Sequence, residues 1–131
     1  MFLKTDTRRT TFVSGAVDDH LLTWLEAFIL DRKSQDVAGG TMRFYQQKLK
    51  LFANYCEAQT ITQISQITPS LLRQFLLNLE ETGHNPGGRH AAFRAARAFL
   101  LWYENEVEPP EWTNHIHKVK EPRVPTDPIE P

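Results

Sequence analysis

Three side chains that can carry positive charge share one face of the predicted helix over residues 84–103, where the sequence reads HNPGGRHAAFRAARAFLLWY. His90, Arg94 and Arg97 are spaced four and three residues apart, so they stand in one row at about 100° per residue. No acidic residue follows in the sequence before Glu104. Such a row can meet a linear polyanion, and it is equally typical of an ordinary solvated face. The row alone leaves both interpretations open.

The start of the same helix predicts a place for an anion. Asn85 is a preferred N-cap residue, and Pro86 suits the first helical turn. Gly87 and Gly88 keep side chains away from the backbone N–H groups there, and Arg89 follows directly. Because first-turn N–H groups attract negative charge, this start can hold a phosphate.

Amphipathic helices must position these residues. Opposite the basic row, the 84–103 helix carries an apolar face: Phe93, Ala96, Leu100 and Tyr103, with Ala92 and Phe99 at its edge. A second helix is predicted from Thr41, as cap or first residue after the Gly39-Gly40 break, to about Gln59. One of its faces is apolar and is predicted to face the core: Phe44, Tyr45, Leu51, Phe52, Tyr55 and Cys56. The other face is basic and polar: Arg43, Gln46, Lys50 and Asn54. This strip is a second candidate contact face, with plain solvent exposure as the alternative.

Two further helices complete the predicted core. One runs from a cap at Asp18 or Asp19 to about Lys33 and has a broad apolar face. The other runs over 68–82, with a Thr68 cap, Pro69 in its first turn and Gly83 as a left-handed terminator. The connection before it supplies isoleucines to the core: Ile61, Ile64 and Ile67.

Length and composition predict one small all-α bundle of four main helices. The 131 residues, 40% apolar, suffice for a single core. We expect a flexible lead-in over 1–17, a helical domain over 18–117 and a proline-rich linker over 118–131. A short helical turn is expected in the EWTNHIHK stretch, and prolines at every third position favour an extended tail. With a net charge of −1, any electrostatic function must come from local asymmetry.

Enzymatic motifs are absent from the sequence. It contains no phosphate-binding glycine motif, no HExxH and no paired CxxC, so we expect no active site, cofactor or metal. His115 and His117 lack a third ligand nearby, and the single Cys56 is interpreted as a core residue. No apolar run approaches the length of a membrane span, and no signal peptide is recognisable, so a cytoplasmic location is expected.

The order of these signals resembles the N-terminal core-binding, or SAM-like, domain of tyrosine recombinases and phage-type integrases. The resemblance covers roughly residues 18–125 and includes the basic, proline-containing VKEPRVP run. The residues that carry it are Thr41, Tyr45, Leu49, Phe52, Ile67, Thr68, Pro69, Leu72, Phe75, Leu79, Gly83, Ala96, Arg97 and Phe99. Gly88 departs from the family, which often has a polar residue there, and Gln46 and Gln47 stand where basic residues are usual. Both departures remove phosphate contacts.

The resemblance implies one half of a clamp around double-stranded DNA. The catalytic domain that cuts and rejoins strands would lie outside these residues, and further recombinase protomers would join on the DNA. No catalytic residue is carried over, because no His-x-x-Arg pair occurs. The predicted DNA contacts, from the resemblance and from local charge together, are Thr41, Arg43, Lys50, Gly88, Arg89, His90, Arg94, Arg97, Lys118, Lys120 and Arg123.

A protein-interaction module is the alternative function. In this interpretation an exposed Leu101 and the basic row receive an acidic partner helix. Salt-sensitive binding to duplex DNA, compared with binding to an acidic protein of similar charge, separates the two functions.

Overall fold

Four helices make up most of the described chain. The structure, a computed structural model, describes residues 19–123. The helices are α1 (Leu21–Ser34), α2 (Gly39–Ala58), α3 (Pro69–Glu81) and α4 (Pro86–Val107), with 3-10 helices η2 (Ile64–Gln66) and η3 (His115–Lys118). Residues 19–123 contain no strand beyond one isolated bridge, so the predicted all-α bundle of four main helices is confirmed. The predicted flexible lead-in over 1–17 and the end of the predicted linker, 124–131, lie outside the described residues.

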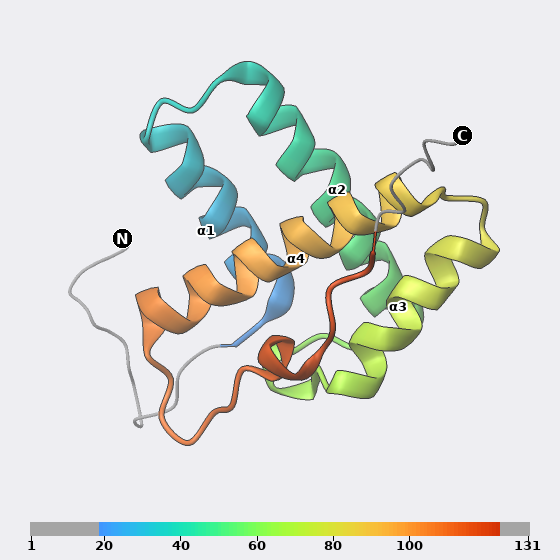
Figure 1. The fold of residues 1–131 in the computed structure, drawn as a ribbon. Helices are drawn as coiled ribbons and strands as arrows, with labels where there is room; N and C mark the ends of the chain where they lie inside the picture. The colour runs from blue at the N-terminus through green and yellow to red at the C-terminus, as the bar shows by residue number, and fades with distance from the viewer. Residues whose placement is uncertain (1–18, 124–131) are drawn as a thin grey trace.

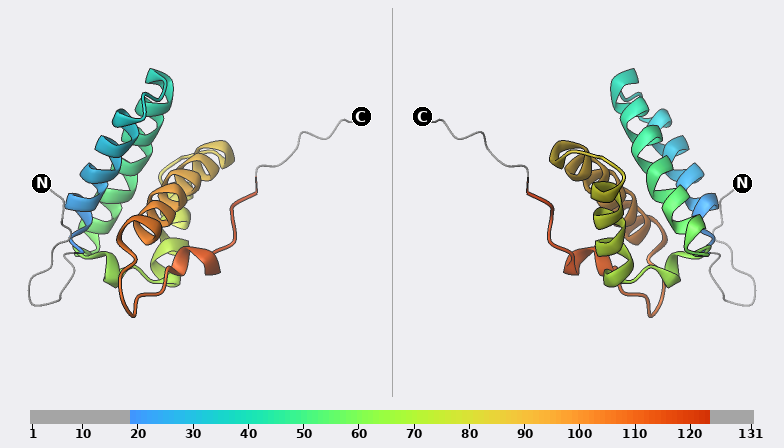
Figure 2. Two further views of the ribbon diagram at one scale, coloured as in Figure 1. Left: turned by 90° about the vertical axis from the view of Figure 1, so that its left-hand side faces the viewer. Right: turned by 90° about the vertical axis from the view of Figure 1, so that its right-hand side faces the viewer.

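The helices form two hairpins that pack on each other. α1 and α2 run antiparallel side by side, and α4 crosses both of them (Figure 1). Figure 2 shows the α1 and α2 pair beside the α3 and α4 pair. α4 contacts each of the other three helices, so its residues form the centre of the core. None of the helices in residues 19–123 is long and apolar enough to cross a membrane.

The core is aromatic and lies against α4. All six residues predicted on the apolar face of α4 are buried: Ala92, Phe93, Ala96, Phe99, Leu100 and Tyr103. Phe28 of α1 packs edge-on against Phe99 at 5.9 Å, and Phe52 packs edge-on against Phe75 at 5.2 Å. The predicted core position of Cys56 is confirmed, and burial raises the pKa of its thiol to about 12. This thiol therefore stays protonated and is a poor nucleophile.

Helix ends agree with the sequence for α3 and α4. The Thr68 side chain accepts a hydrogen bond from Leu71 N at 3.0 Å, and the Asn85 side chain accepts one from Gly88 N at 2.7 Å. Gly83 has a φ of 97°, the left-handed conformation that was predicted. α4 continues one turn past Tyr103 and ends before Glu108.

The predicted starts of α1 and α2 are wrong. α1 begins at Leu21 after His20, and Asp19 accepts a hydrogen bond from Ser65 N at 3.0 Å instead of capping the helix. The Asp19 side chain thus connects the η2 segment to the residues before α1, which are far away in the sequence. Asp18, the other predicted cap, lies outside the described residues. α2 begins at Gly39, with Ala38 as its N-cap, so Thr41 lies inside the first turn. In that turn most N–H groups have no intrahelical partner, which lowers the cost of glycine.

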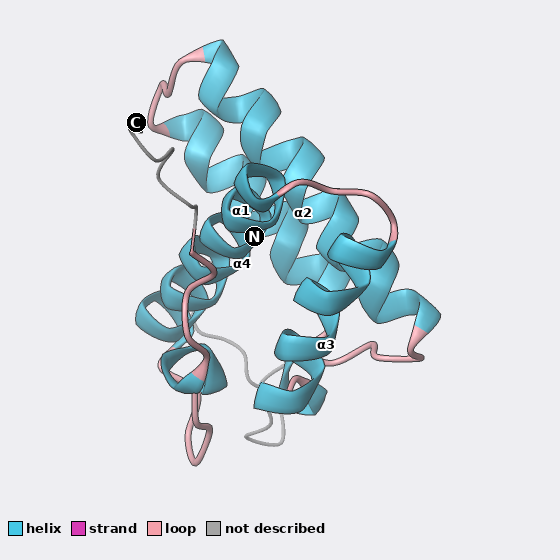
Figure 3. Ribbon diagram, turned by 45° about the vertical axis from the view of Figure 1, so that its right-hand side comes forward, coloured by secondary structure: helices cyan, strands magenta, loops and turns pink. Residues whose placement is uncertain are grey.

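The segment after α4, residues 108–123, folds back along α3 and α4 (Figure 3). Asn114 is buried; it donates to Leu100 O at 3.1 Å and to the Glu104 carboxylate at 3.0 Å. Arg73 of α3 donates to Lys118 O at 3.1 Å. The short helical turn predicted here is confirmed as η3, and burial continues through Val119. This segment is therefore packed onto the bundle.

Candidate nucleic-acid interface

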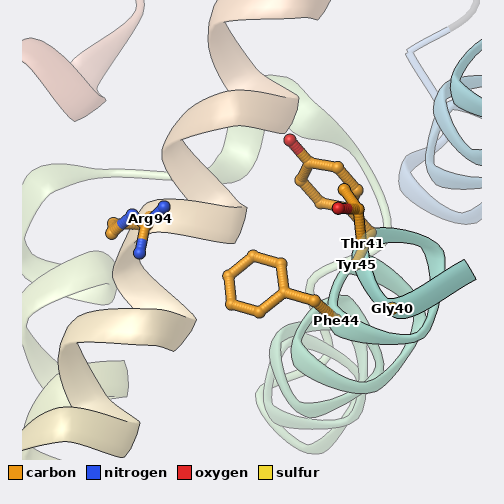
Figure 4. A pocket seen from close by; sticks show the side chains of 5 residues that line it. All are labelled: Gly40, Thr41, Phe44, Tyr45 and Arg94. Atoms are coloured by element: carbon orange, nitrogen blue, oxygen red, sulfur yellow. The ribbon is translucent and has the colours of Figure 1, made fainter. Parts of the chain in front are cut away.

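A groove lies between the first half of α2 and the middle of α4. Two adjoining hollows of about 320 and 260 Å³ share the side chains of Phe44, Tyr45 and Arg94. Figure 4 shows Phe44 and Tyr45 reaching from α2 toward α4, where Arg94 lies. The remaining lining residues are Gly40, Thr41, Arg97, Ala98 and Leu101. The groove therefore combines an apolar lining with two arginines.

The two arginines of the groove are exposed and uncompensated. Arg94 and Arg97 stand on the solvent side of α4, where the sequence predicted them. Within residues 19–123, neither side chain has an ion pair with an acidic residue. The Arg94 guanidinium carbon lies 5.7 Å from the centroid of the Phe44 ring. Both charges are thus available to an anionic partner.

The start of α2 adds positive potential at one end of the groove. Its first turn contains no acidic residue, and no side chain caps it. The Arg43 guanidinium lies beside this turn, since a Cβ built on Gly39 would be 3.5 Å from Arg43 Nη1. First-turn N–H groups and a guanidinium both favour an anion nearby. Thr41, in the same turn, lines the groove and is exposed.

The start of α4 is less open than the sequence suggested. The Gly88 N–H is engaged by the Asn85 side chain, so the predicted anion site has lost one of its donors. Arg89 is half-buried, and its Nε is buried without a hydrogen-bond partner in the described part of the chain. An arginine in the first turn is disfavoured by the helix dipole, and an anion bound nearby would relieve that repulsion.

An acidic side chain lies beside the predicted basic row. His90 is half-buried and pairs with Glu121 of the C-terminal segment. The helix itself carries no acidic residue before Glu104, as the sequence shows, so this carboxylate comes from a distant segment. Because 31 residues separate the two side chains, only the fold brings them together.

The other predicted contacts lie outside the groove. Arg43 and Lys50 are exposed on α2, about 100° and about 120° around the helix from Phe44, the α2 residue whose ring lies near the Arg94 guanidinium. On the C-terminal segment, the side chains of Lys118, Lys120 and Arg123 are all exposed. The structure therefore joins Thr41, Arg94 and Arg97 in one groove and spreads the remaining predicted contacts around it.

Sequence reasoning missed the apolar part of the groove. Phe44 and Tyr45 were predicted on the core-facing side of the helix, and both do pack against the core. They are only half-buried because they also line the groove, which was not predicted. Leu101 is half-buried in the same groove, so the expectation that it is exposed is wrong. Helical periodicity cannot distinguish these positions, because it gives the side of the helix and not the gap between two crossing helices.

A polar cluster occupies the opposite end of α4. Glu104 accepts from Asn114, and its carboxylate lies 3.1 Å from His117 Nε2. The hydrogen bond from Asn114, and then that from His117, hold the pKa of Glu104 below its usual value. In residues 19–123 no group of three or more His, Cys, Asp or Glu side chains is placed to hold a metal ion.

Comparison with known proteins identifies a family match. Residues 23–106 match the family described as phage integrase, N-terminal SAM-like domain. The crystal structure of the N-terminal domain of a phage integrase/site-specific recombinase from Haloarcula marismortui is similar, with a TM-score of 0.71. At 16% identity, covering 81% of this chain and 99% of that one, the similarity concerns the fold alone. No curated protein has a matching sequence.

Proposed function

The chain belongs to the family of phage integrase N-terminal SAM-like domains, as its sequence predicted, and we propose that it binds double-stranded DNA as the clamp domain of a site-specific recombinase. The observation that carries this proposal is the pair of exposed arginines, Arg94 and Arg97, beside the positive start of α2. The domain acts in this proposal without catalysing strand cleavage itself.

The proposed contacts are mainly to phosphates. Guanidinium groups bind phosphate in a planar, often bidentate geometry, and helix starts donate backbone N–H groups to it. The groove arginines and the first turn of α2, with Arg43 beside it, supply both kinds of donor. Contacts of this kind fix the protein on the duplex without reading its sequence. In this proposal, one or two of these arginines contact base edges in the major or minor groove of the DNA instead of a phosphate.

The proposed partners follow from the family. A recombinase catalytic domain acts together with this one, and further protomers assemble on the same DNA. The segment that folds back along α3 and α4 fixes where the chain passes the start of α4, beside His90. A DNA-binding domain acts in the compartment that contains the DNA, and we propose that this compartment is the cytoplasm.

Charge reversal on the groove tests the proposal. Arg94→Glu together with Arg97→Glu should abolish binding to duplex DNA in a fluorescence titration, since two attractions become repulsions. The thermal unfolding curve should change little, because both side chains are exposed. The single Arg97→Glu variant should also weaken binding. Its matched control is Lys33→Glu, which reverses an exposed helical charge at the end of α1, outside the groove, and should weaken binding less. If the double reversal leaves binding intact, the groove is not the interface.

The apolar lining of the groove favours a second candidate function. Phe44, Tyr45 and Leu101, which share the groove with two arginines, also suit an acidic amphipathic helix of a protein partner. A duplex DNA and an acidic protein of similar net charge should be titrated at the same salt concentrations. If the domain binds the acidic protein more tightly than the DNA, protein binding is favoured over DNA binding as its function.

A further inference from the structure

We propose that Phe44 is a positioning residue that holds the Arg94 guanidinium in place for contact with DNA. The inference rests on the proposed DNA-binding function and adds to it a residue that carries no charge. Phe44 lies on α2 and Arg94 on α4, so the pair bridges the groove (Figure 4).

The contact with Phe44 is what orients Arg94. The guanidinium carbon lies 5.7 Å from the ring centroid, within the range of a cation–π interaction. In residues 19–123 the structure gives the Arg94 side chain no hydrogen bond or ion pair. A long exposed side chain with no other partner samples many rotamers, and the ring removes part of that freedom.

The Phe44 ring is itself anchored to the core. It packs edge-on against Tyr45 at 5.5 Å, and Tyr45 packs edge-on against Phe28 at 5.2 Å. Phe28 is fully buried. The chain of rings therefore connects the Arg94 guanidinium to the rigid centre of the bundle.

A cation–π interaction uses the charge of the guanidinium and occupies none of its N–H donors. The Arg94 guanidinium lies over the Phe44 ring at 5.7 Å from the centroid, so its five N–H donors remain available. Arg94 can thus stay on Phe44 and still donate to a phosphate. Because its orientation is set before binding, less conformational entropy is lost when DNA arrives.

Arg97 provides a comparison within the same groove. It also lines the groove and is also exposed, and no ring contact holds its guanidinium in residues 19–123. Lysine keeps the charge, but its compact and strongly hydrated ammonium group forms cation–π contacts less often than a guanidinium does. Arg94→Lys should therefore weaken DNA binding more than Arg97→Lys does.

A double-mutant cycle tests the positioning role. Phe44→Leu should weaken binding to duplex DNA about 2–5-fold, the range of an exposed cation–π contact. In the Arg94→Ala background, Phe44→Leu should have no further effect on affinity. Phe44→Tyr, which keeps the aromatic ring, should bind duplex DNA with the wild-type affinity. An equal loss in both backgrounds would overturn the proposal, because Phe44 would then act without Arg94.

A measurement without DNA separates this inference from the proposed function. The side-chain protons of Arg94 should show an upfield NMR shift from the Phe44 ring, absent for Arg97 and lost in Phe44→Leu. If wild-type protein fails to bind DNA while this shift is present, the proposed function fails and the contact stands. If the shift is absent, or if wild-type binds DNA and Phe44→Leu binds equally well, the positioning role is refuted.

Discussion

The groove between α2 and α4 and the C-terminal segment over 108–123 differ in how their polar side chains are paired, although Lys118, Lys120 and Arg123 of that segment are exposed like the groove arginines. In the groove, Arg94 and Arg97 have no acidic partner among the described residues. In the C-terminal segment, His117 meets Glu104 and Glu121 meets His90. Arginines without an acidic partner are available for binding an anion, whereas the polar pairs of the C-terminal segment add to the burial of Asn114, Ile116 and Val119, which holds that segment on the bundle. The difference separates a binding surface from a structural strap within one small domain.

The largest expected effect tests whether the C-terminal segment is part of the folded unit. Ile116 is buried at the centre of this segment, 2% exposed. Ile116→Ala should lower the free energy of unfolding by about 2–5 kcal/mol, the cost of a cavity in a packed core. Denaturant titration measures this value, with the exposed Lys120→Ala as the control. Equal stability of both variants would show that the segment is a loose linker.

A smaller effect tests whether Glu121 competes with DNA for His90. The Glu121 carboxylate lies against the basic row that is proposed to face phosphates. Glu121→Gln should raise the affinity for duplex DNA about 2–5-fold, since a carboxylate no longer occupies His90 or repels the backbone.

The control for this prediction removes the same charge elsewhere. Glu111 is exposed beyond the C-terminal end of α4, far along the chain from the basic row. Glu111→Gln should change the affinity less than Glu121→Gln does. Equal gains from both variants would mean that only net charge matters and that the contact with His90 has no role.

The smallest effect concerns acid stability at the other end of α4. The pKa of Glu104 is lowered by the hydrogen bond from Asn114 and then by that from His117. A lowered pKa stabilises the fold above the usual carboxyl range, and this stabilisation is lost as pH falls through the folded pKa. The stability difference between wild-type and Glu104→Gln should therefore shrink on acidification below about pH 4. A difference that stays constant with pH would contradict this.

The sequence predicted the parts of this molecule that depend on local patterns. The apolar face of α4, the caps at Thr68 and Asn85 and the terminator Gly83 all depend on residues within a turn or two of each other. Helix periodicity and capping preferences act over that range, which is why these positions are confirmed.

The contacts that the sequence did not reveal join residues far apart in the chain. Asp19 was expected to cap α1 and instead binds Ser65 N, and Glu121 reaches His90 across 31 residues. Phe44 packs against the core as predicted, but periodicity did not reveal that it also lines a groove toward α4. Which polar groups pair and which apolar groups line a gap depend on how whole helices cross, and no local pattern encodes that crossing.

The salt dependence of DNA binding by the wild-type protein tests the central claim most directly. If about five phosphates are neutralised, the logarithm of the binding constant should fall against the logarithm of salt concentration with a slope of roughly −4 to −5. Arg94→Ala should make this slope less steep by about one. A slope near zero in the wild-type titration would contradict the claim that this groove binds the DNA backbone.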